Sequence, residues 1–405
     1  MQRYDNKKIW GFNPNVFFLG IVSLLTDISS EMIFTLVPLF LSNVLKSTFV
    51  VIGFVGGLSE SIDAACRIFS GWFSDKVGKR KPLTVLGYSV STIIKPFMYL
   101  ATSWGAVLAV RFGDRVGKGI RSSSRDALIA DSASSAERGK GFGLHRAMDT
   151  CGAVLGLVIA AIIIYLVQGG DLQLGQDTYK WIVLVGTVPA VIAVIVLIIF
   201  VRDKKRIDLA AGNHDIKLPL NKLTVGFDKR FILFLAVIAI FTLGNSSDFF
   251  VILRAQNLEA PLIQITMMLV LFNISYMLTS LPAGIISDRW GRKKVITVGW
   301  LIYTMVYLGF ALSTELWQIW LLFAGYGVYY GMAEGAARAF VADLVPPERR
   351  GTAYGLYHGV IGITLFPASL LAGWLWQTIS PAAPFYFGSS LAFLAMLCML
   401  VLVRK

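Results

Sequence analysis

Five basic side chains recur at steps of three or four residues within one otherwise apolar stretch of the chain. They would fall within roughly 120° of one face of an α-helix, at about 100° per residue; they are Arg111, Arg115, Lys118, Arg121 and Arg125. A guanidinium can hold a carboxylate or a phosphate through two parallel hydrogen bonds. We therefore predict that Arg111, Arg115 and Lys118 bind an acidic group of a ligand, with Arg115 as the principal contact.

Ion pairs within the protein are the alternative explanation for these charges. The candidate partners are the carboxylates Asp114, Asp126, Asp63 and Asp149. We expect such pairing for Arg125 and Arg121, because they lie toward one end of the stretch. Arg115 and Lys118 lie near its middle, where we expect them to line a cavity.

Acidic residues accompany the basic ones. Asp27 and Glu31 are one helical turn apart and share a face, Glu60 and Asp63 form a second such set, and Asp149 lies near the start of a later apolar stretch. A proton and an arginine can compete for one carboxylate, and this competition would couple proton movement to ligand movement. We predict proton-coupling roles for Asp27, Glu31, Asp63 and Asp149. A permanent internal salt bridge is the alternative.

The second half of the chain has fewer charges in its apolar stretches and more aromatic residues. Its main candidate charges are Asp248, Arg254, Glu334 and Arg338. Tyr326 and Tyr330 lie beside glycines, which permit close helix approach, and we predict that both tyrosines contact the ligand. The sequence therefore indicates ion chemistry in the first half and shape and apolar contact in the second.

The elements that position these residues follow from composition. The chain has 405 residues, 56% hydrophobic and 15% charged, with a mean hydropathy of +0.68, whereas a soluble protein carries about 25% charge. This composition excludes an ordinary soluble enzyme, a disordered protein and a fibrous protein. Apolar stretches long enough to cross a membrane as helices fall at 14–41, 49–74, 82–104, 105–132, 137–168, 177–201, 230–254, 261–286, 293–314, 315–344, 348–378 and 382–403. We predict an all-α polytopic membrane protein with twelve transmembrane helices.

The net charge of +13 is distributed as in a membrane protein, not as in a nucleic-acid-binding one. Basic clusters at 76–81, 202–206 and 289–294 lie in alternate gaps between apolar stretches, and the other gaps hold little beyond Lys46 and Lys180. By the positive-inside rule both termini are cytoplasmic. We expect a multi-pass protein of the plasma (inner) membrane that has the lipid bilayer, and no nucleic acid, as a partner.

The sequence contains no recognisable signal of an enzyme or a metalloprotein. The three cysteines lie in apolar stretches, the three histidines are far apart, and no GxxxxGK[ST] phosphate-binding loop is present. Such a loop would be expected if ATP supplied the energy. We predict no enzymatic activity, no metal and no cofactor.

Two blocks of sequence occur twice. The block Gly71–Lys81 recurs as Gly284–Lys294, 213 residues later, and a second block around Asp131 recurs around Asp343, 212 residues later. Matched blocks in one order at nearly one offset indicate a tandem duplication of a six-span unit. We predict an N-terminal six-helix bundle in 1–201, a cytoplasmic linker in 202–229 and a C-terminal six-helix bundle in 230–405.

On these motifs the sequence resembles the major facilitator superfamily over essentially the whole chain. The loop motif of that family, G-x-x-x-D-[RK]-x-G-[RK]-[RK], is met in full at 71–80 and at 284–293, and its fourth-span motif R-x-x-Q-G is approximated at 115–119, with Lys118 in place of glutamine. The fifth-span proline-glycine motif of drug/proton antiporters is absent. The resemblance implies two pseudo-symmetric bundles, a central substrate cavity and alternating access by rocking.

The repeated loop motif also suggests a gate. Its residues and their expected partners are Asp75, Lys79 and Asp131 in the first half, and Asp288, Arg292 and Asp343 in the second. Gly78 and Gly291 would allow a tight turn, so that Lys79 and Arg292 reach the carboxylates at the ends of the fourth and tenth spans. We predict that such pairs hold the cytoplasmic face in one conformation. The alternative is that the basic residues only fix the topology.

These features together predict a secondary active transporter of a small organic solute. We expect proton coupling, a preference for an organic anion or a zwitterion, and a monomer. A drug or amphiphile exporter working by proton antiport is the alternative within transport. A membrane sensor or assembly protein that binds a ligand without moving it is the alternative from another class.

Overall fold

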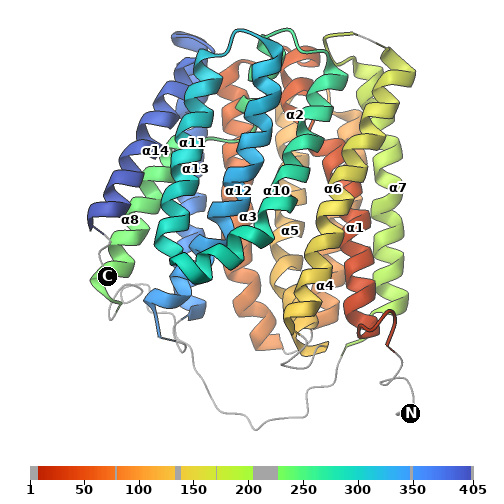
Figure 1. Cartoon of the computed structure of the whole chain (residues 1–405). Coiled ribbons are helices and arrows are strands. Elements are labelled where there is room, and N and C mark those ends of the chain that lie inside the picture. The colour runs from red at the N-terminus through yellow and green to blue at the C-terminus, as the bar shows by residue number, and fades with distance from the viewer. Residues whose placement is uncertain are drawn as a thin grey trace.

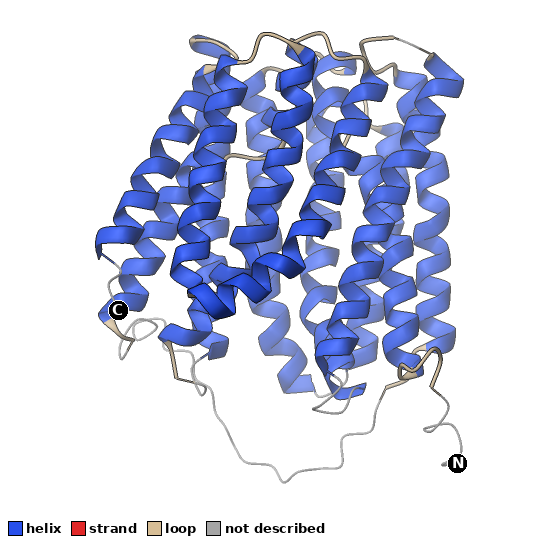
Figure 2. Ribbon diagram, viewed as in Figure 1, coloured by secondary structure: helices blue, strands red, loops and turns tan. Residues whose placement is uncertain are grey.

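The structure is a computed structural model that describes residues 8–77, 80–132, 138–169, 171–203, 227–346 and 350–402. These residues fold almost entirely as helices, and no β-strand occurs among them (Figure 2). The fold class predicted from the sequence, an all-α polytopic membrane protein, is therefore confirmed.

The first half of the chain forms six spans, four of which are single unbroken helices of 25 residues or more. Its elements are α1 (Pro14–Phe34), α2 (Val37–Leu39), the π-helix η1 (Phe40–Val44), α3 (Phe49–Val77), α4 (Arg80–Ile94), the 3-10 helix η2 (Lys95–Leu100), α5 (Trp104–Ser132), α6 (Arg138–Gln168) and α7 (Gln176–Phe200). The elements α1, α2 and η1 form the first span, and α4 and η2 form the third.

The second half forms the other six spans. Its elements are α8 (Lys229–Gly244), α9 (Phe249–Asn257), α10 (Leu262–Trp290), α11 (Arg292–Leu312), α12 (Leu316–Leu344), α13 (Arg350–Thr378) and α14 (Ala383–Leu402). Ten spans are long and apolar enough to cross a membrane. The other two, α5 and α12, lie among them (Figure 1); α5 carries many charges and α12 is rich in glycine and tyrosine.

The helices run roughly side by side, and α1 begins at the same end of the bundle at which α14 ends (Figure 1). We call this the terminal end and the opposite one the distal end. The basic clusters at 80–81 and 292–294 begin α4 and α11 at the terminal end, while Lys46 and Lys180 lie at the distal end.

Three of the predicted continuous helices are broken. The stretches 14–41, 82–104 and 230–254 are interrupted after Phe34, Ile94 and Gly244. Prolines at 38 and 96 account for the first two breaks, since proline cannot donate to the helical ladder. The third break is the sequence Asn-Ser-Ser-Asp at 245–248, in which the Ser247 amide donates to Ser369 Oγ at 3.0 Å. Non-helical backbone at membrane depth is tolerated where it is buried in protein or lines a cavity.

The two halves are in close contact near the distal end. A Cβ atom added to Gly53 of α3 would lie 2.2 Å from the carbonyl oxygen of Ser369 in α13, and one added to Gly373 would lie 2.4 Å from that of Phe49. The short helix α2 also packs on α9. These contacts need glycine, because any side chain would hold the helices apart, and they close the distal side of the bundle.

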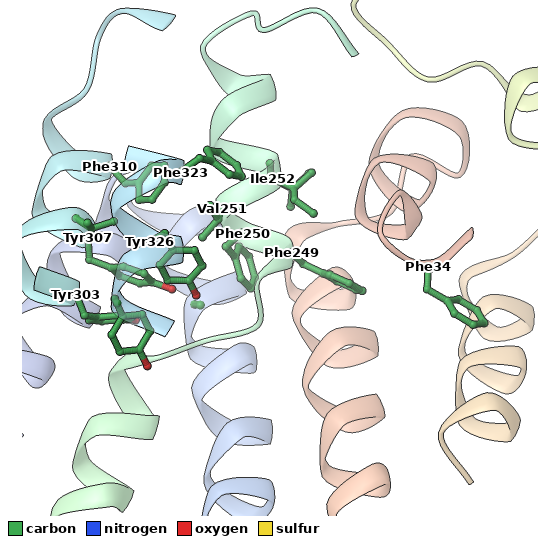
Figure 3. Packing of buried hydrophobic residues seen from close by; sticks show 14 of the residues in the cluster. Phe34, Phe249, Phe250, Val251, Ile252, Tyr303, Tyr307, Phe310, Phe323 and Tyr326 are labelled. Atoms are coloured by element: carbon green, nitrogen blue, oxygen red, sulfur yellow. The ribbon is translucent and has the colours of Figure 1, made fainter. Parts of the chain in front are cut away.

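Aromatic packing fixes α9 against its neighbours in the second half. Tyr303 and Tyr307 of α11 stack with ring centroids 4.1 Å apart, and Tyr326 of α12 lies 6.0 Å from Tyr307. Figure 3 shows Phe249 pointing away from these three rings, toward the side of the molecule that carries Phe34. Phe250 of α9 packs on Trp376 of α13, with ring centroids 5.9 Å apart, and Phe249 lies 5.4 Å from the guanidinium of Arg111 in α5, so the start of α9 contacts both halves.

Candidate substrate-binding cavity

A cavity of about 560 Å³ lies between the helices of the first half and those of the second. On one side, the charged and tyrosine residues of its lining come from α1, α3 and α5. On the other side, they come from α12, from α13 and from the break that precedes α9. They include Asp27, Glu31, Glu60, Asp63, Arg111, Arg115, Lys118, Arg121, Asp248, Tyr329, Tyr330, Glu334, Arg338 and Tyr357. The volume falls within the range of about 300–1,000 Å³ typical of small-molecule sites.

The basic face of α5 forms one wall, as the spacing predicted. Arg111, Arg115 and Lys118 all line the cavity. Glu60 of α3 lies between the two arginines: its Oε1 is 2.5 Å from Arg115 Nη2 and 3.6 Å from Arg111 Nη2. One carboxylate therefore serves two guanidinium groups, which leaves the wall with surplus positive charge at this point.

Arg111 is held by aromatic rings as well as by Glu60. Its guanidinium carbon lies 5.1 Å from the centroid of Phe34 and 5.4 Å from that of Phe249, which belongs to the second half. A cation between two aromatic faces is stabilised by the ring quadrupoles. Arg111 thus contacts both halves at the distal limit of the cavity.

Several guanidinium N–H groups on this wall lack an acceptor among the described residues. They are the Nε groups of Arg111 and Arg115, together with Nε and Nη1 of Arg121. Arg121 lies over the Tyr88 ring at 4.7 Å and lines the cavity, without a carboxylate partner in the described part of the chain. We expected it to pair with a carboxylate, as Arg125 does with Asp126 at 2.9 Å. Buried donors without an acceptor are costly, so this wall carries positive charge that its own side chains do not fully compensate.

Three of the four predicted proton-coupling carboxylates line the cavity. They are Asp27, Glu31 and Asp63; Glu31 accepts a hydrogen bond from Thr35 at 2.7 Å. The fourth, Asp149, is not among the lining residues. It faces α1, where Ser23 donates to it, and its Oδ2 is 3.5 Å from His145 Nδ1.

Two charged residues near the cavity were not among those predicted to form the site. Glu60, one turn before Asp63 on the same face of α3, lines the cavity as Asp63 does and is the carboxylate that pairs with Arg115. Lys95 is fully buried, and its ammonium donates to Ser29 and Ser30 of α1 at 2.9 and 3.0 Å. A single lysine before a proline inside an apolar stretch was the available signal for Lys95.

The two tyrosines predicted to contact the ligand occupy different places. Tyr330 lines the cavity, whereas Tyr326 is buried behind it. Both hydroxyls donate to the carboxylate of Asp248, Tyr326 at 2.7 Å and Tyr330 at 3.4 Å. Tyr326 therefore acts on the cavity through Asp248.

A polar cluster around Glu334 connects the two halves nearer the terminal end. Tyr276 of α10 donates to Glu334 at 2.5 Å, and Arg338 pairs with it one turn along α12. Arg146 of α6 also pairs with Glu334 at 3.7 Å and donates to Tyr276. This cluster joins α6 of the first half to α10 and α12 of the second.

The second copy of the loop motif has the geometry that its spacing predicted. Gly291 turns between α10 and α11 with φ 94°, and Arg292 Nε lies 2.9 Å from Asp343 Oδ2 and 3.7 Å, through Nη2, from Asp288. All three side chains belong to the second half, so the contact ties α10, α11 and α12 together. The side chains of Asp75, Lys79 and Asp131 lie outside the described residues.

Comparisons with known proteins agree with this architecture. The model of the Major Facilitator Superfamily matches residues 19–255 and 233–405. An uncharacterized MFS-type transporter of Methanocaldococcus jannaschii is 40% identical over 403 residues, which cover 98% of this chain and 96% of that protein. Multidrug resistance protein 2 of Bacillus subtilis is 31% identical over 33% of each chain. The solved structure of a mutant of the nucleoside transporter NupG superposes with a TM-score of 0.80 at 14% identity, covering 96% of this chain and 100% of that one.

Proposed function

Because the chain belongs to the major facilitator superfamily, we propose that this multi-pass membrane transporter moves a small organic anion or zwitterion by proton-coupled alternating access. The observation that carries the proposal is the group of four basic side chains of α5 that line the cavity, Arg111, Arg115, Lys118 and Arg121. A ligand carboxylate or phosphate would be attracted to this basic wall and would accept hydrogen bonds from it.

Arg115 is the principal anion contact in this proposal. It lines the cavity beside Arg111 and Lys118, and Glu60 engages its Nη2 but not its Nε. Its guanidinium carries planar, paired N–H donors of the kind that suits a carboxylate. Lysine at this position would keep the charge and lose that arrangement.

Proton coupling is assigned to Asp27, Glu31 and Asp63, which share the cavity with these bases. Asp27 and Lys118 line the same cavity. Protonation of Asp27 would remove a negative charge beside the bases of α5, which would then attract an anionic substrate more strongly. Asp149 is not a lining residue, so its part in coupling would be indirect.

The transport cycle follows from the duplicated architecture. We propose that 1–201 and 230–405 rock against each other around the cavity, joined by 202–229, with the terminal end and both termini in the cytoplasm and the protein working as a monomer of the plasma membrane. The predicted gating residues Asp75, Lys79 and Asp131, with their counterparts Asp288, Arg292 and Asp343, would stabilise the cytoplasmic ends in one conformation. The close distal contact of Gly53 with Ser369 suits a conformation closed to the outside.

An exporter of drugs or amphiphiles by proton antiport is the second candidate. It is favoured by the similarity of a third of the chain to the Bacillus subtilis multidrug resistance protein, and by the aromatic lining of the second half, which includes Phe241, Phe272 and Trp300. In that case Asp27 and Glu31 would meet a cationic substrate.

A thermal-shift screen followed by flux measurement separates these candidates. Metabolites grouped by charge are tested for stabilisation of the purified protein, since a ligand that binds the folded state stabilises it by mass action. We expect acid-bearing compounds to stabilise the wild type and to be carried into proteoliposomes when a pH gradient is imposed. Stabilisation by lipophilic cations alone would instead support the exporter.

The decisive variant is Arg115→Lys, with Asp177→Asn as the matched control. Asp177 is exposed at the start of α7, and its one ion pair with a described residue is a 3.9 Å contact with Lys180. We expect Arg115→Lys to weaken binding of an acidic ligand by about tenfold or more, in line with about 1.4 kcal/mol for a charged hydrogen bond. Unchanged affinity in Arg115→Lys would contradict the assigned role.

A further inference from the structure

The charged side chains that line the cavity are a group of bases and a group of carboxylates. Four of the five lining bases belong to α5, and the fifth is Arg338. Six carboxylates line the same space: Asp27, Glu31, Glu60, Asp63, Asp248 and Glu334. With six carboxylates to five lysine and arginine side chains, the described lining does not attract a simple anion by its net charge, so the placement of the individual carboxylates decides which ligand fits.

Asp248 differs from the other carboxylates of the second half. It lies at the end of the Asn-Ser-Ser-Asp break, directly before α9, and its side chain makes no capping hydrogen bond to that helix. Its carboxylate is exposed in the cavity and accepts hydrogen bonds from Tyr326 and Tyr330. No cationic side chain of the described residues forms an ion pair with it, whereas Glu334 has two arginine partners.

The two tyrosine contacts orient Asp248 without neutralising it. The short contact, at 2.7 Å, reaches Oδ1, while Oδ2 receives only the 3.5 Å contact from Tyr330. One carboxylate oxygen is therefore largely open to a donor in the cavity. An ionised carboxylate is acceptor-only, so the group that completes this site must be a hydrogen-bond donor, and a cation satisfies it best.

Aromatic rings lie beside the two tyrosines that contact Asp248, since Phe272 is 5.5 Å from both of them. Phe249, Phe272 and Tyr330 all line the cavity, and the rings of Phe272 and Tyr330 are 5.5 Å apart in an edge-to-face arrangement. An ammonium group next to a carboxylate and against aromatic faces gains both ionic and cation–π stabilisation. The combination of these groups distinguishes this place from a solvated surface aspartate.

We infer that Asp248, held by Tyr326 and Tyr330, forms a subsite for an amino group of the transported substrate. The inference rests on the proposed function and narrows it: the substrate is an amino-bearing acid, whose acidic group binds Arg115 and whose ammonium group binds Asp248. Arg111 connects the two subsites: its guanidinium lies 5.4 Å from the ring of Phe249, the residue next to Asp248, and shares Glu60 with Arg115. Asp248 and Arg115 both line one cavity, where one zwitterion would bind both.

Two series of matched probes test the subsite. The first is phenylalanine, 3-phenylpropionate and phenethylamine, and the second is 5-aminovalerate, valerate and butylamine. Each series contains a zwitterion, the same chain without its amino group and the same chain without its carboxyl group. Dissociation constants are measured on the purified full-length protein, for the wild type and for Asp248→Asn, with Asp177→Asn as the control.

We expect the zwitterion of at least one series to bind the wild type at least tenfold more tightly than its des-amino partner. In Asp248→Asn this advantage should disappear, while the affinity for the des-amino acid stays within about threefold. Asp248→Glu should restore part of the advantage. Tyr330→Phe, which removes one donor to Asp248 and keeps the ring, should reduce the advantage about threefold and provides the readout if Asp248→Asn does not fold.

The outcomes separate the subsite from the proposed function. If acids bind and the amino group adds nothing to affinity, the proposed function stands and the subsite is refuted. If amines bind through Asp248 and the carboxyl group adds nothing, the subsite stands and the assignment of an acidic group to Arg115 fails. If Asp248→Asn keeps the preference for the zwitterion, or no amino-bearing probe binds the wild type, the inference is overturned.

Discussion

Replacing Gly53 by alanine should shift the transporter away from the conformation described here. The new Cβ atom would lie 2.2 Å from the carbonyl oxygen of Ser369 and 3.0 Å from its carbonyl carbon. Both are backbone atoms, so no side-chain rotation can relieve the overlap. Because unstrained non-bonded heavy atoms lie more than about 3 Å apart, α3 and α13 would have to separate by about 1 Å at this point.

The size of the shift follows from the cost of overpacking. Forcing one extra carbon into a close contact costs about 1–3 kcal/mol, and this cost falls only on the conformation in which α3 and α13 touch at the distal end. A conformation with these ends apart is unaffected. The equilibrium between the two should therefore change by about 5- to 150-fold in favour of the one that is open at the distal end.

Gly105→Ala is the matched control for Gly53→Ala. A Cβ atom at Gly105, near the distal start of α5, would meet only the hydroxyl of Ser103, at 3.9 Å. Both substitutions replace a helical glycine by alanine, which favours the helix by about 1 kcal/mol in either case. The difference between the two variants therefore isolates the contact with Ser369.

Spin labels at Asp177→Cys and Thr314→Cys provide the measurement, because these exposed positions lie at the distal ends of different halves. The background lacks the native cysteines Cys66, Cys151 and Cys398. Gly53→Ala should add a population with a longer distance between the labels, and Gly105→Ala should not. Equal distance distributions in the two variants would refute the assignment of this glycine contact to distal closure.

Three further predictions concern coupling, the gate and the orientation. Asp27→Asn should abolish uptake driven by a pH gradient and spare substrate-for-substrate exchange, which needs no net proton movement; accumulation against a gradient by the variant would contradict the role. Asp343→Asn removes the 2.9 Å partner of Arg292 and should lower turnover while ligand affinity stays within a few-fold, as kinetic and binding assays can show. A membrane-impermeant thiol reagent added to intact cells should modify Lys46→Cys and leave Arg230→Cys unmodified, and the opposite pattern would reverse the orientation.

Much of the fold follows from hydropathy and from the internal repeat, but the break at 245–248 does not. The apolar stretch 230–254 contains Asn245 and Asp248, but its mean hydropathy is still that of a membrane span. The break forms because tertiary partners are present: Ser369 accepts the amide of Ser247, and Tyr303 donates to Asn245. A pattern along one helix carries no information about such partners on other helices.

The candidate site also has features that the sequence predicts and features that it does not. The basic face of α5 was predictable, because a helical period fixes which side chains share a face. The period could not decide between Glu60 and Asp63 as the partner of Arg115, since both lie on one face of α3 and the rotation of α3 against α5 selects Glu60. Tyr326 was identified as a ligand contact by its neighbouring glycines, but the close approach that they permit buries it behind Asp248.

The duplication also explains why the two halves contribute different chemistry to one cavity. Thr35, which follows the end of α1, lies 213 residues before Asp248, so the first and seventh spans break at equivalent positions. The same offset relates Glu60 to Asn273 and Arg121 to Glu334. The repeated scaffold therefore presents equivalent positions to the cavity with different charges.

A substrate held by Arg115 in one half and Asp248 in the other would bridge both halves, and its binding energy would favour whichever conformation brings these two residues to the right separation. No further structural element would then be needed to couple substrate binding to the rocking of the two halves.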